Sequence, residues 1–174
     1  MNFERMIHET GEGVRSSLFS LLEHGDFEEG RYWHRRVYRN NEVILSEGGY
    51  SGKVFLVLHG ATRIVGSVAI SDDYQVRPGV RDLGRGDMFG ELSMLDHGPH
   101  SATVIAISDC ELAVIDSQSL LEFIEKNRDV GYEIFRELCH MLVDRLRKTD
   151  KQVFSLLAWG LKAHGYEKYM QHGA

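Results

Sequence analysis

Apolar residues along this chain follow three successive patterns. Within residues 1–30, leucines recur at helical spacing, which predicts an N-terminal helical segment. Residues 31–126 are expected to form the β domain. From residue 31 to about residue 116 the period shortens towards two, and short apolar runs alternate with turns rich in Gly, Asn and Asp. Beyond Asp116 the spacing is helical again. The order predicts a mainly β domain with helices at both ends.

The β region consists of many short segments. An alternating stretch runs from Tyr32 to Val37, and the apolar runs after it are Val43–Leu45, Val54–Leu58, Ile64–Val65, Val68–Ile70, Thr103–Ile107 and Leu112–Ile115. Glycine or Asn/Asp turns separate most of these runs. Such a series is typical of an antiparallel sandwich or barrel.

Two helices are predicted after the β region, a short one over Ser117–Glu125 and a long one over residues 127–160. The long helix carries an apolar stripe near heptad spacing and no proline, which favours packing against the same helix of a second copy. The alternative is a helix lying on its own barrel. Residues 161–174 are expected to form a short amphipathic tail. Gly131 weakens the helix near its start and marks a candidate hinge.

Composition narrows the functional classes. The chain has 174 residues, 43% of them hydrophobic and 26% charged, which suits one domain with a substantial core. The net charge of −6 argues against a general DNA-binding surface. No apolar run reaches the length of a membrane span and no signal peptide is recognisable, so we expect a cytoplasmic protein without membrane contact. Cys110 and Cys139 lie far apart in apolar contexts, which predicts free, buried thiols.

The chemistry is concentrated in residues 84–107. Glycines at 84, 86 and 90 permit positive φ and close approach of the backbone to a ligand. Glu91 follows Gly90 and begins a short apolar helical turn, whose free amides suit an anion. A carboxylate at that point suits a neutral hydrogen-bond donor, such as a ribose hydroxyl. A turn and the segment Pro99-His100-Ser101-Ala102 follow before the next apolar run.

Two stretches, Phe89–Leu95 and Pro99–Val104, resemble the phosphate-binding cassette of the cyclic nucleotide-binding domain family. The glycine turn at Glu47-Gly48-Gly49 and the run Val54–Gly60 are similar to the family upstream of the cassette. The resemblance implies a double-stranded β-helix, which is a jelly-roll-like antiparallel barrel with an N-terminal helix, a short cassette helix and a long C-terminal helix. It also implies a regulatory sensor for cAMP or cGMP, not an enzyme.

The resemblance assigns a role to individual residues. Glu91 matches the acid that binds the ribose 2′-hydroxyl, and the amides of Gly90, Glu91, Ser101 and Ala102 match groups around the cyclic phosphate. Thr149 and Asp150 are similar to a segment of the long helix that caps the base. The expected ligand-binding residues are Gly90, Glu91, Leu92, Pro99, His100, Ser101, Ala102, Thr149 and Asp150.

The departure from the family pattern is His100, which occupies the position of an arginine that binds the phosphate. Arginine is always charged and bidentate, whereas histidine is partly neutral at pH 7. Three interpretations stay open: His100 becomes protonated on binding, the pocket is degenerate or uses another cation such as Arg85, or the ligand is different. A degenerate fold would act as a dimerisation or protein-interaction scaffold.

Other motifs favour structural explanations. His97 and His100 form a pair without a third metal ligand at suggestive spacing, so we expect no metal and no cofactor. No catalytic motif is recognisable. Arginines and aromatic residues interleave over Arg31–Arg39, which indicates a solvated strand face more than a nucleic-acid patch. No helix-turn-helix is recognisable after the long helix, so we expect a stand-alone module that binds no DNA and signals to an unidentified effector protein.

Overall fold

The structure is a computed structural model that describes residues 17–66, 68–71, 74–76 and 79–164. The chain divides into two compact units, Met1–Tyr132 and Glu133–Ala174, and each is described by itself. The first unit contains the strands and the short helices, and the second consists, in its described part, of a single continuous helix.

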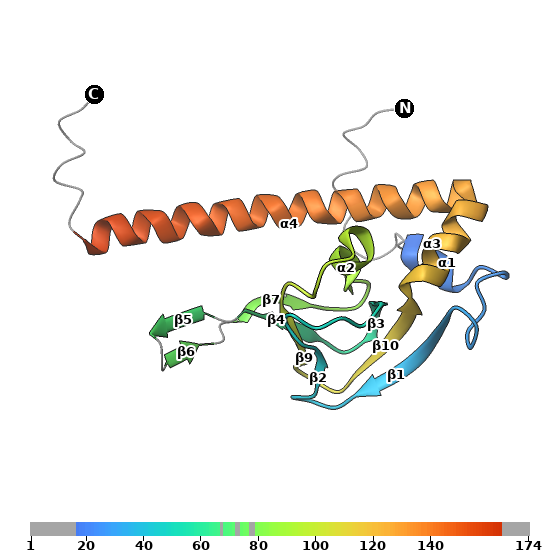
Figure 1. Cartoon of the computed structure of the whole chain (residues 1–174), viewed down its shortest axis with the longest axis horizontal. Helices are drawn as coiled ribbons and strands as arrows, with labels where there is room; N and C mark the ends of the chain where they lie inside the picture. The colour runs from blue at the N-terminus through green and yellow to red at the C-terminus, as the bar shows by residue number, and fades with distance from the viewer. Residues whose placement is uncertain (1–16, 67, 72–73, 77–78, 165–174) are drawn as a thin grey trace, which may run out of the picture. The chain divides into compact units, whose positions relative to one another are not determined.

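The elements follow in the order predicted by the sequence (Figure 1). The helices are α1 (Ser17–Leu22), α2 (Glu91–Asp96), α3 (Ser117–Lys126) and α4 (Arg128–Ala163). The strands are β1 (Trp33–Tyr38), β2 (Val43–Leu45), β3 (Lys53–His59), β4 (Thr62–Val65), β5 (Val68–Ser71), β6 (Tyr74–Val76), β7 (Gly79–Leu83), β8 (Met88–Phe89), β9 (Thr103–Ala106) and β10 (Cys110–Asp116).

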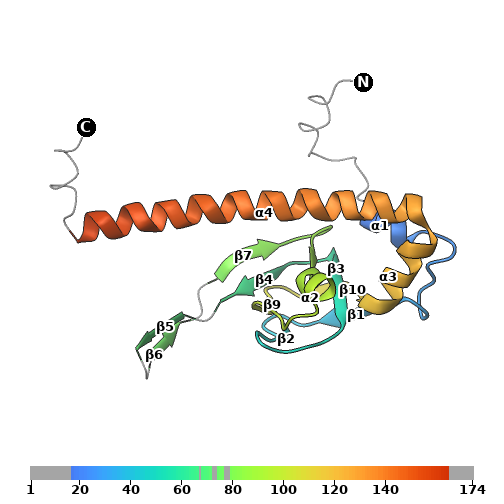
Figure 2. The ribbon, with the colours of Figure 1, turned by 45° about the horizontal axis from the view of Figure 1, so that its top comes forward.

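The strands form two four-stranded antiparallel sheets, in the orders β1-β10-β3-β8 and β2-β9-β4-β7. A separate hairpin, β5–β6, extends beyond the ends of β4 and β7 (Figure 2). Strands far apart in sequence pair in each sheet, as β1 does with β10, and this is the connectivity of a jelly-roll-like barrel. The predicted fold class is confirmed.

The core of the barrel is built from residues of both sheets. Buried side chains from the first sheet include Phe55, Val57 and Leu112, and the second sheet contributes Leu83 and Val104. A second set of buried side chains joins the ends of the barrel to the short helices. The ring of Phe27 stacks on Tyr32 at 4.9 Å and meets Phe123 of α3 edge-on at the same distance.

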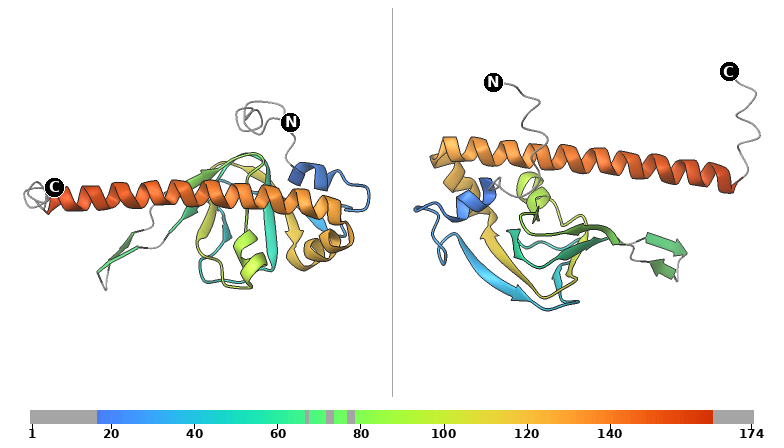
Figure 3. Two further views of the ribbon diagram at one scale, coloured as in Figure 1. Left: turned by 90° about the horizontal axis from the view of Figure 1, so that it is seen from above. Right: turned by 180° about the vertical axis from the view of Figure 1, so that it is seen from behind.

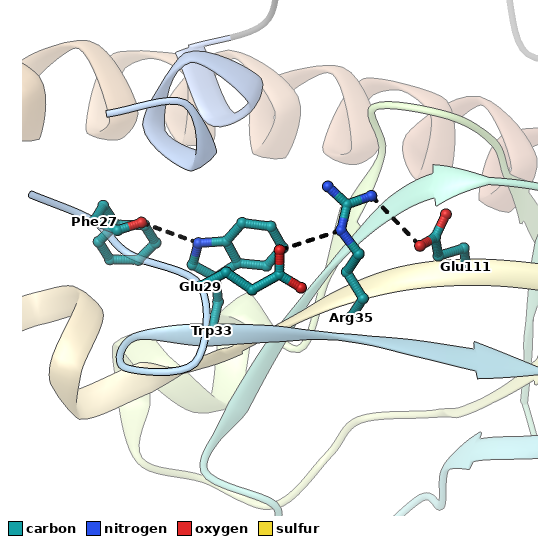
Figure 4. A network of polar contacts seen from close by, with 5 residues as sticks. All are labelled: Phe27, Glu29, Trp33, Arg35 and Glu111. Carbon is teal, nitrogen blue, oxygen red and sulfur yellow. Dashed lines mark hydrogen bonds and ion pairs between the residues drawn. The ribbon is translucent and has the colours of Figure 1, made fainter. Parts of the chain in front are cut away.

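Polar contacts hold the segment after α1 against the first sheet. The indole Nε1 of Trp33 donates to the carbonyl oxygen of Phe27 at 3.0 Å. The Arg35 guanidinium reaches Glu29 on one side and Glu111 of β10 on the other (Figure 4). The chain before β1 is therefore fixed to both β1 and β10, and α1 lies beside α3 (Figure 3).

Several expectations differ from the structure. The segments β6, β7 and β8 were not predicted as strands, because β6 and β8 are only three and two residues long and Arg81 and Asp82 interrupt the apolar pattern of β7. In the predicted 1–30 segment only Ser17–Leu22 is helical among the described residues, and residues 1–16 lie outside the described part. Cys110 is buried as predicted, whereas the prediction of a buried Cys139 is wrong, since Cys139 is exposed on α4.

The boundaries of the long helix also shift. It begins at Arg128 and ends at Ala163, whereas the sequence predicts residues 127–160. The first residues of the expected 161–174 tail therefore continue the helix, and residues 165–174 lie outside the described part.

Candidate functional site

The entry to α2 depends on a glycine. Gly90 has φ of +85° and caps α2, and a Cβ added there would lie 2.6 Å from the carbonyl oxygen of Lys53. Only a residue without a side chain adopts this turn so close to β3. The turn brings Glu91 to the first position of α2, where it is 1% exposed. A buried carboxylate at this point is the arrangement that the sequence predicts for a hydroxyl ligand.

His100 is held by the glycine turn that the sequence singles out upstream. Its backbone amide donates to the carbonyl of Gly49, and its carbonyl accepts from the amide of Gly48, both at 2.8 Å. This pair of hydrogen bonds fixes the backbone of the Pro99–Ala102 segment beside β2. The glycines at 48 and 49 therefore position His100, which is a role that their sequence alone does not reveal.

The imidazole of His100 is buried, with 6% of the residue exposed. Its Nδ1 lies 3.0 Å from the Ser93 hydroxyl oxygen on α2. Its Nε2 is also buried and has no hydrogen-bond partner among the described residues. One ring nitrogen of His100 therefore has an unmet hydrogen bond in this structure. Burying a polar atom without a partner costs free energy.

Burial also determines the charge of this group. The pKa of His100 is lowered from its ordinary value of 6.5, because burial penalises the protonated form. The imidazole is therefore mainly neutral at pH 7. When the Ser93 hydroxyl donates to Nδ1, the proton of the neutral ring resides on Nε2, which then has a hydrogen bond to donate.

Most of the other predicted ligand-binding residues lie next to Glu91 or His100 in the sequence. Ser101 and Pro99 are exposed, Ala102 is half-buried and Leu92 is 42% exposed. Thr149 and Asp150 belong to α4 in the second unit, where the Thr149 hydroxyl donates to the carbonyl of Arg145 at 3.0 Å. Within the first unit, the contact between the Ser93 hydroxyl and the His100 ring joins α2 to the Pro99–Ala102 segment.

Arg85, considered above as a substitute cation, is engaged elsewhere. Its guanidinium donates to the carbonyl of Leu58 and lies over the ring of Phe19 on α1, 4.7 Å from the ring centroid. Both contacts hold the side chain beside α1, so they argue against Arg85 as the cation of the cassette.

A different arginine was missed by the sequence reasoning. Arg81 lies on β7, and its Nη1 is buried without a hydrogen-bond partner among the described residues. The signal in the sequence is the alternation in Val80-Arg81-Asp82-Leu83, which places Arg81 on the same strand face as buried Leu83.

The described residues contain no cluster of three or more His, Cys, Asp or Glu side chains suited to a metal ion. None of the described helices combines the length and apolar character of a membrane span.

The family model described as "Cyclic nucleotide-binding domain" matches residues 35–127, more than half of the chain. The chain belongs to this family.

Among curated proteins, the cyclic AMP receptor protein of Thermus thermophilus is 29% identical over 122 residues, covering 70% of this chain and 53% of that protein. The crystal structure of the Thermus thermophilus catabolite activator protein superposes with a TM-score of 0.61 at 26% identity, covering 86% of this chain and 61% of that one. A cyclic nucleotide-binding domain from Methylobacillus flagellatus shares the fold, with a TM-score of 0.66 at 19% identity over 84% of this chain and 75% of that one. The chain spans about half the length of the curated receptor.

Proposed function

We propose that this chain is a sensor module that binds cAMP or cGMP and passes the signal on through its long helix. The observation that carries the proposal is the cassette itself. A buried carboxylate, Glu91, stands at the start of α2, and a buried imidazole with an unmet hydrogen bond, His100, is attached to the same helix through Ser93. Family membership and the named Thermus receptor support a cyclic nucleotide as the ligand.

Each group has a role that suits its chemistry. Glu91 accepts a hydrogen bond from the ribose 2′-hydroxyl, since a carboxylate is an acceptor only. His100 donates from Nε2 to an exocyclic phosphate oxygen. The backbone amides of Gly90, Glu91, Ser101 and Ala102 complete the phosphate cradle. Leu92 and Pro99 border it, and Thr149 and Asp150 approach the base when α4 covers the ligand.

Signalling follows from a two-state equilibrium of the cassette and α4. Asn127 ends α3, and α4 begins at the next residue, so the junction is short. Gly131 in the first turns of α4 has no room for a side chain, because an added Cβ would lie 2.8 Å from the carbonyl oxygen of Ile124. Closing the cassette would displace this junction and with it α4, which an effector protein then reads.

Exposed apolar side chains on α4, in the second unit, support the proposal of a homodimer. Val153, Leu156 and Leu157 on α4 are 55%, 68% and 57% exposed in the single chain. Large apolar side chains at heptad-like spacing are commonly covered by a second helix. Free Cys110 and Cys139 suit a reducing, cytoplasmic setting. The net charge of −6 over the 174 residues disfavours binding of this chain to DNA.

The second candidate is a scaffold that keeps the fold without the nucleotide. It is favoured by the lowered pKa of His100, since a neutral imidazole lacks the permanent charge of arginine. A charge-assisted hydrogen bond is worth about 1.5–3 kcal/mol, so this difference corresponds to roughly tenfold to hundredfold in affinity.

Calorimetry separates these functions. The wild-type protein is titrated with cAMP, cGMP and a cyclic dinucleotide, next to Glu91→Gln and His100→Arg. We expect binding of a cyclic mononucleotide, a loss of about tenfold or more in Glu91→Gln, and tighter binding in His100→Arg. Binding only by His100→Arg would identify a degenerate pocket. If neither the wild-type protein nor His100→Arg binds a nucleotide, the scaffold is favoured. Binding of the dinucleotide alone would indicate a different ligand.

A further inference from the structure

The imidazole of His100 is held by two segments that lie far apart in the chain. Its Nδ1 lies 3.0 Å from the Ser93 hydroxyl oxygen of α2. The opposite edge of the ring lies beside the glycine turn, since a Cβ added to Gly49 would be 3.9 Å from the His100 Cδ2. The same turn binds the backbone of His100 through Gly48 and Gly49. The turn therefore positions the residue, and Ser93 determines the hydrogen bonding of its ring.

The direction of the hydrogen bond at Nδ1 decides what Nε2 offers to a ligand. A neutral imidazole carries one proton, either on Nδ1 or on Nε2. If Nδ1 donated to Ser93, the buried Nε2 would be a bare acceptor, which repels a phosphate oxygen. If the Ser93 hydroxyl donates to Nδ1, the proton is on Nε2, whose hydrogen bond is unmet in this structure. Only the second arrangement suits an anionic ligand.

A hydroxyl is suited to this task because it both donates and accepts hydrogen bonds. It donates to Nδ1 of the neutral ring, and it accepts from Nδ1 when the ring is protonated. Alanine at position 93 would do neither. An arginine at position 100 would need neither, since a guanidinium is a donor in its only charge state.

We propose that Ser93 is a positioning residue of the phosphate site, whose hydroxyl holds the His100 ring with its Nε2 proton available to a cyclic phosphate. The Ser93–His100 pair then acts in place of the single arginine of the family pattern. This inference rests on the proposed function, because it assigns the phosphate contact to His100.

The first test measures the tautomer directly. Proton–nitrogen NMR correlations of the ligand-free protein at about pH 8, where the ring is neutral, identify the protonated nitrogen. His100→Gln assigns the signals of this ring among the nine histidines. We expect the proton on Nε2 in the wild type and in Ser93→Thr, which keeps the hydroxyl, and a mixture of both tautomers in Ser93→Ala. A wild-type ring protonated on Nδ1 overturns the inference.

The second test is a double-mutant cycle, measured by calorimetry with cAMP and cGMP. We expect Ser93→Ala to weaken binding about threefold to tenfold, the value of one neutral hydrogen bond, and Ser93→Thr to stay within about twofold of the wild type. In the His100→Arg background, Ser93→Ala should change the affinity by less than about twofold, because the guanidinium does not depend on the hydroxyl.

Ser117 offers a matched control. Ser93 of α2 and Ser117 of α3 line the same cavity, which has a volume of about 370 Å³. Ser117→Ala removes a hydroxyl from this cavity and leaves the contact between Ser93 and His100 in place, so we expect the wild-type affinity and tautomer. An equal loss of affinity in Ser117→Ala and Ser93→Ala would trace the effect to the cavity and overturn the inference.

The outcomes separate this inference from the proposed function. An unchanged affinity in Ser93→Ala, or an equal loss in the wild-type and His100→Arg backgrounds, overturns the role of Ser93 and leaves the sensor function standing. A wild-type protein that binds neither cAMP nor cGMP overturns the proposed function, and the inference fails with it.

Discussion

At the scale of single residues, His100 is the group in which burial and charge oppose one another. Burial lowers its pKa below 6.5, and the Ser93 hydroxyl occupies one of its two ring nitrogens. An anionic phosphate at Nε2 would act in the opposite direction, since a nearby negative charge favours the protonated ring. If the proposed ligand binds there, the protonation state of this one side chain couples ligand binding to pH.

The first prediction follows from this coupling. Without ligand, the folded chain keeps His100 neutral to a lower pH than the unfolded chain does. The free energy of unfolding therefore decreases as pH falls below 6.5 towards the lowered pKa. With phosphate bound, the pKa rises and binding takes up a proton, so the affinity for a cyclic nucleotide increases from about pH 8 to about pH 6.

Calorimetry across that pH range measures the effect on affinity. His97→Asn is the control, because His97 has φ of +57°, which asparagine tolerates, and its removal is expected to leave the pH dependence unchanged. In His100→Arg the affinity should become nearly independent of pH in this range, since arginine stays charged. An affinity of the wild type that is flat between these pH values would show that His100 does not become protonated on binding.

A second residue-scale prediction concerns Gly90. Gly90→Ala combines a positive φ with a Cβ at 2.6 Å from the Lys53 carbonyl oxygen, so we expect a loss of roughly 2–4 kcal/mol in the free energy of unfolding. Urea denaturation measures it. Gly84→Ala is the matched control, because nothing lies within 4 Å of its added Cβ, and it should change stability by less than about 1 kcal/mol. Equal losses of stability in Gly90→Ala and Gly84→Ala would show that the backbone at residue 90 adjusts to a side chain.

At the scale of elements, α3 depends on a single capping side chain. Asp116 accepts from the backbone amide of Ser119 at 2.8 Å and from the Lys53 ammonium at 2.9 Å. The ion pair with Lys53, and then the amide of Ser119, lower the pKa of Asp116 to about 2. The stabilisation is thus present above the ordinary pKa of 3.8 and is lost as pH falls towards 2.

Two substitutions separate the cap from the ion pair. Asp116→Asn keeps a capping oxygen and loses the ion pair, which is partly exposed and worth about 0–1 kcal/mol. Asp116→Ala loses both, so we expect about 1 kcal/mol more destabilisation by thermal or urea unfolding at pH 7. Lys53→Met, which removes only the ion pair, should resemble Asp116→Asn. Similar losses for alanine and asparagine would contradict the capping role.

At the scale of the whole molecule, the prediction concerns assembly through α4. Leu156→Glu places a charge among the exposed apolar side chains of α4, and we expect it to shift a homodimer to monomers in sedimentation experiments at micromolar concentration. Ser155→Glu adds the same charge one position away, outside the heptad-like stripe, and should leave the dimer intact. A wild-type chain that is monomeric at these concentrations would exclude dimerisation through this helix.

The sequence predicted most of the fold because strands and helices differ in the period of their apolar positions. It did not reveal β7, since Arg81 and Asp82 interrupt the apolar pattern there. Pairing with β4 nevertheless provides hydrogen-bond partners for the backbone of β7. It also predicted a buried Cys139 from its apolar neighbours, whereas the direction of a side chain on a long helix decides its exposure.

By itself, the sequence determined the local features of the site: the positive φ of Gly90, the acid at the start of α2 and the histidine in place of an arginine. These depend on residues adjacent in the chain, so their order is sufficient. Only the tertiary structure decided that the Gly48–Gly49 turn holds His100, that burial keeps its ring neutral, and that Arg81 faces the interior. Those properties depend on which distant strands pair and exclude water, and no local pattern specifies that.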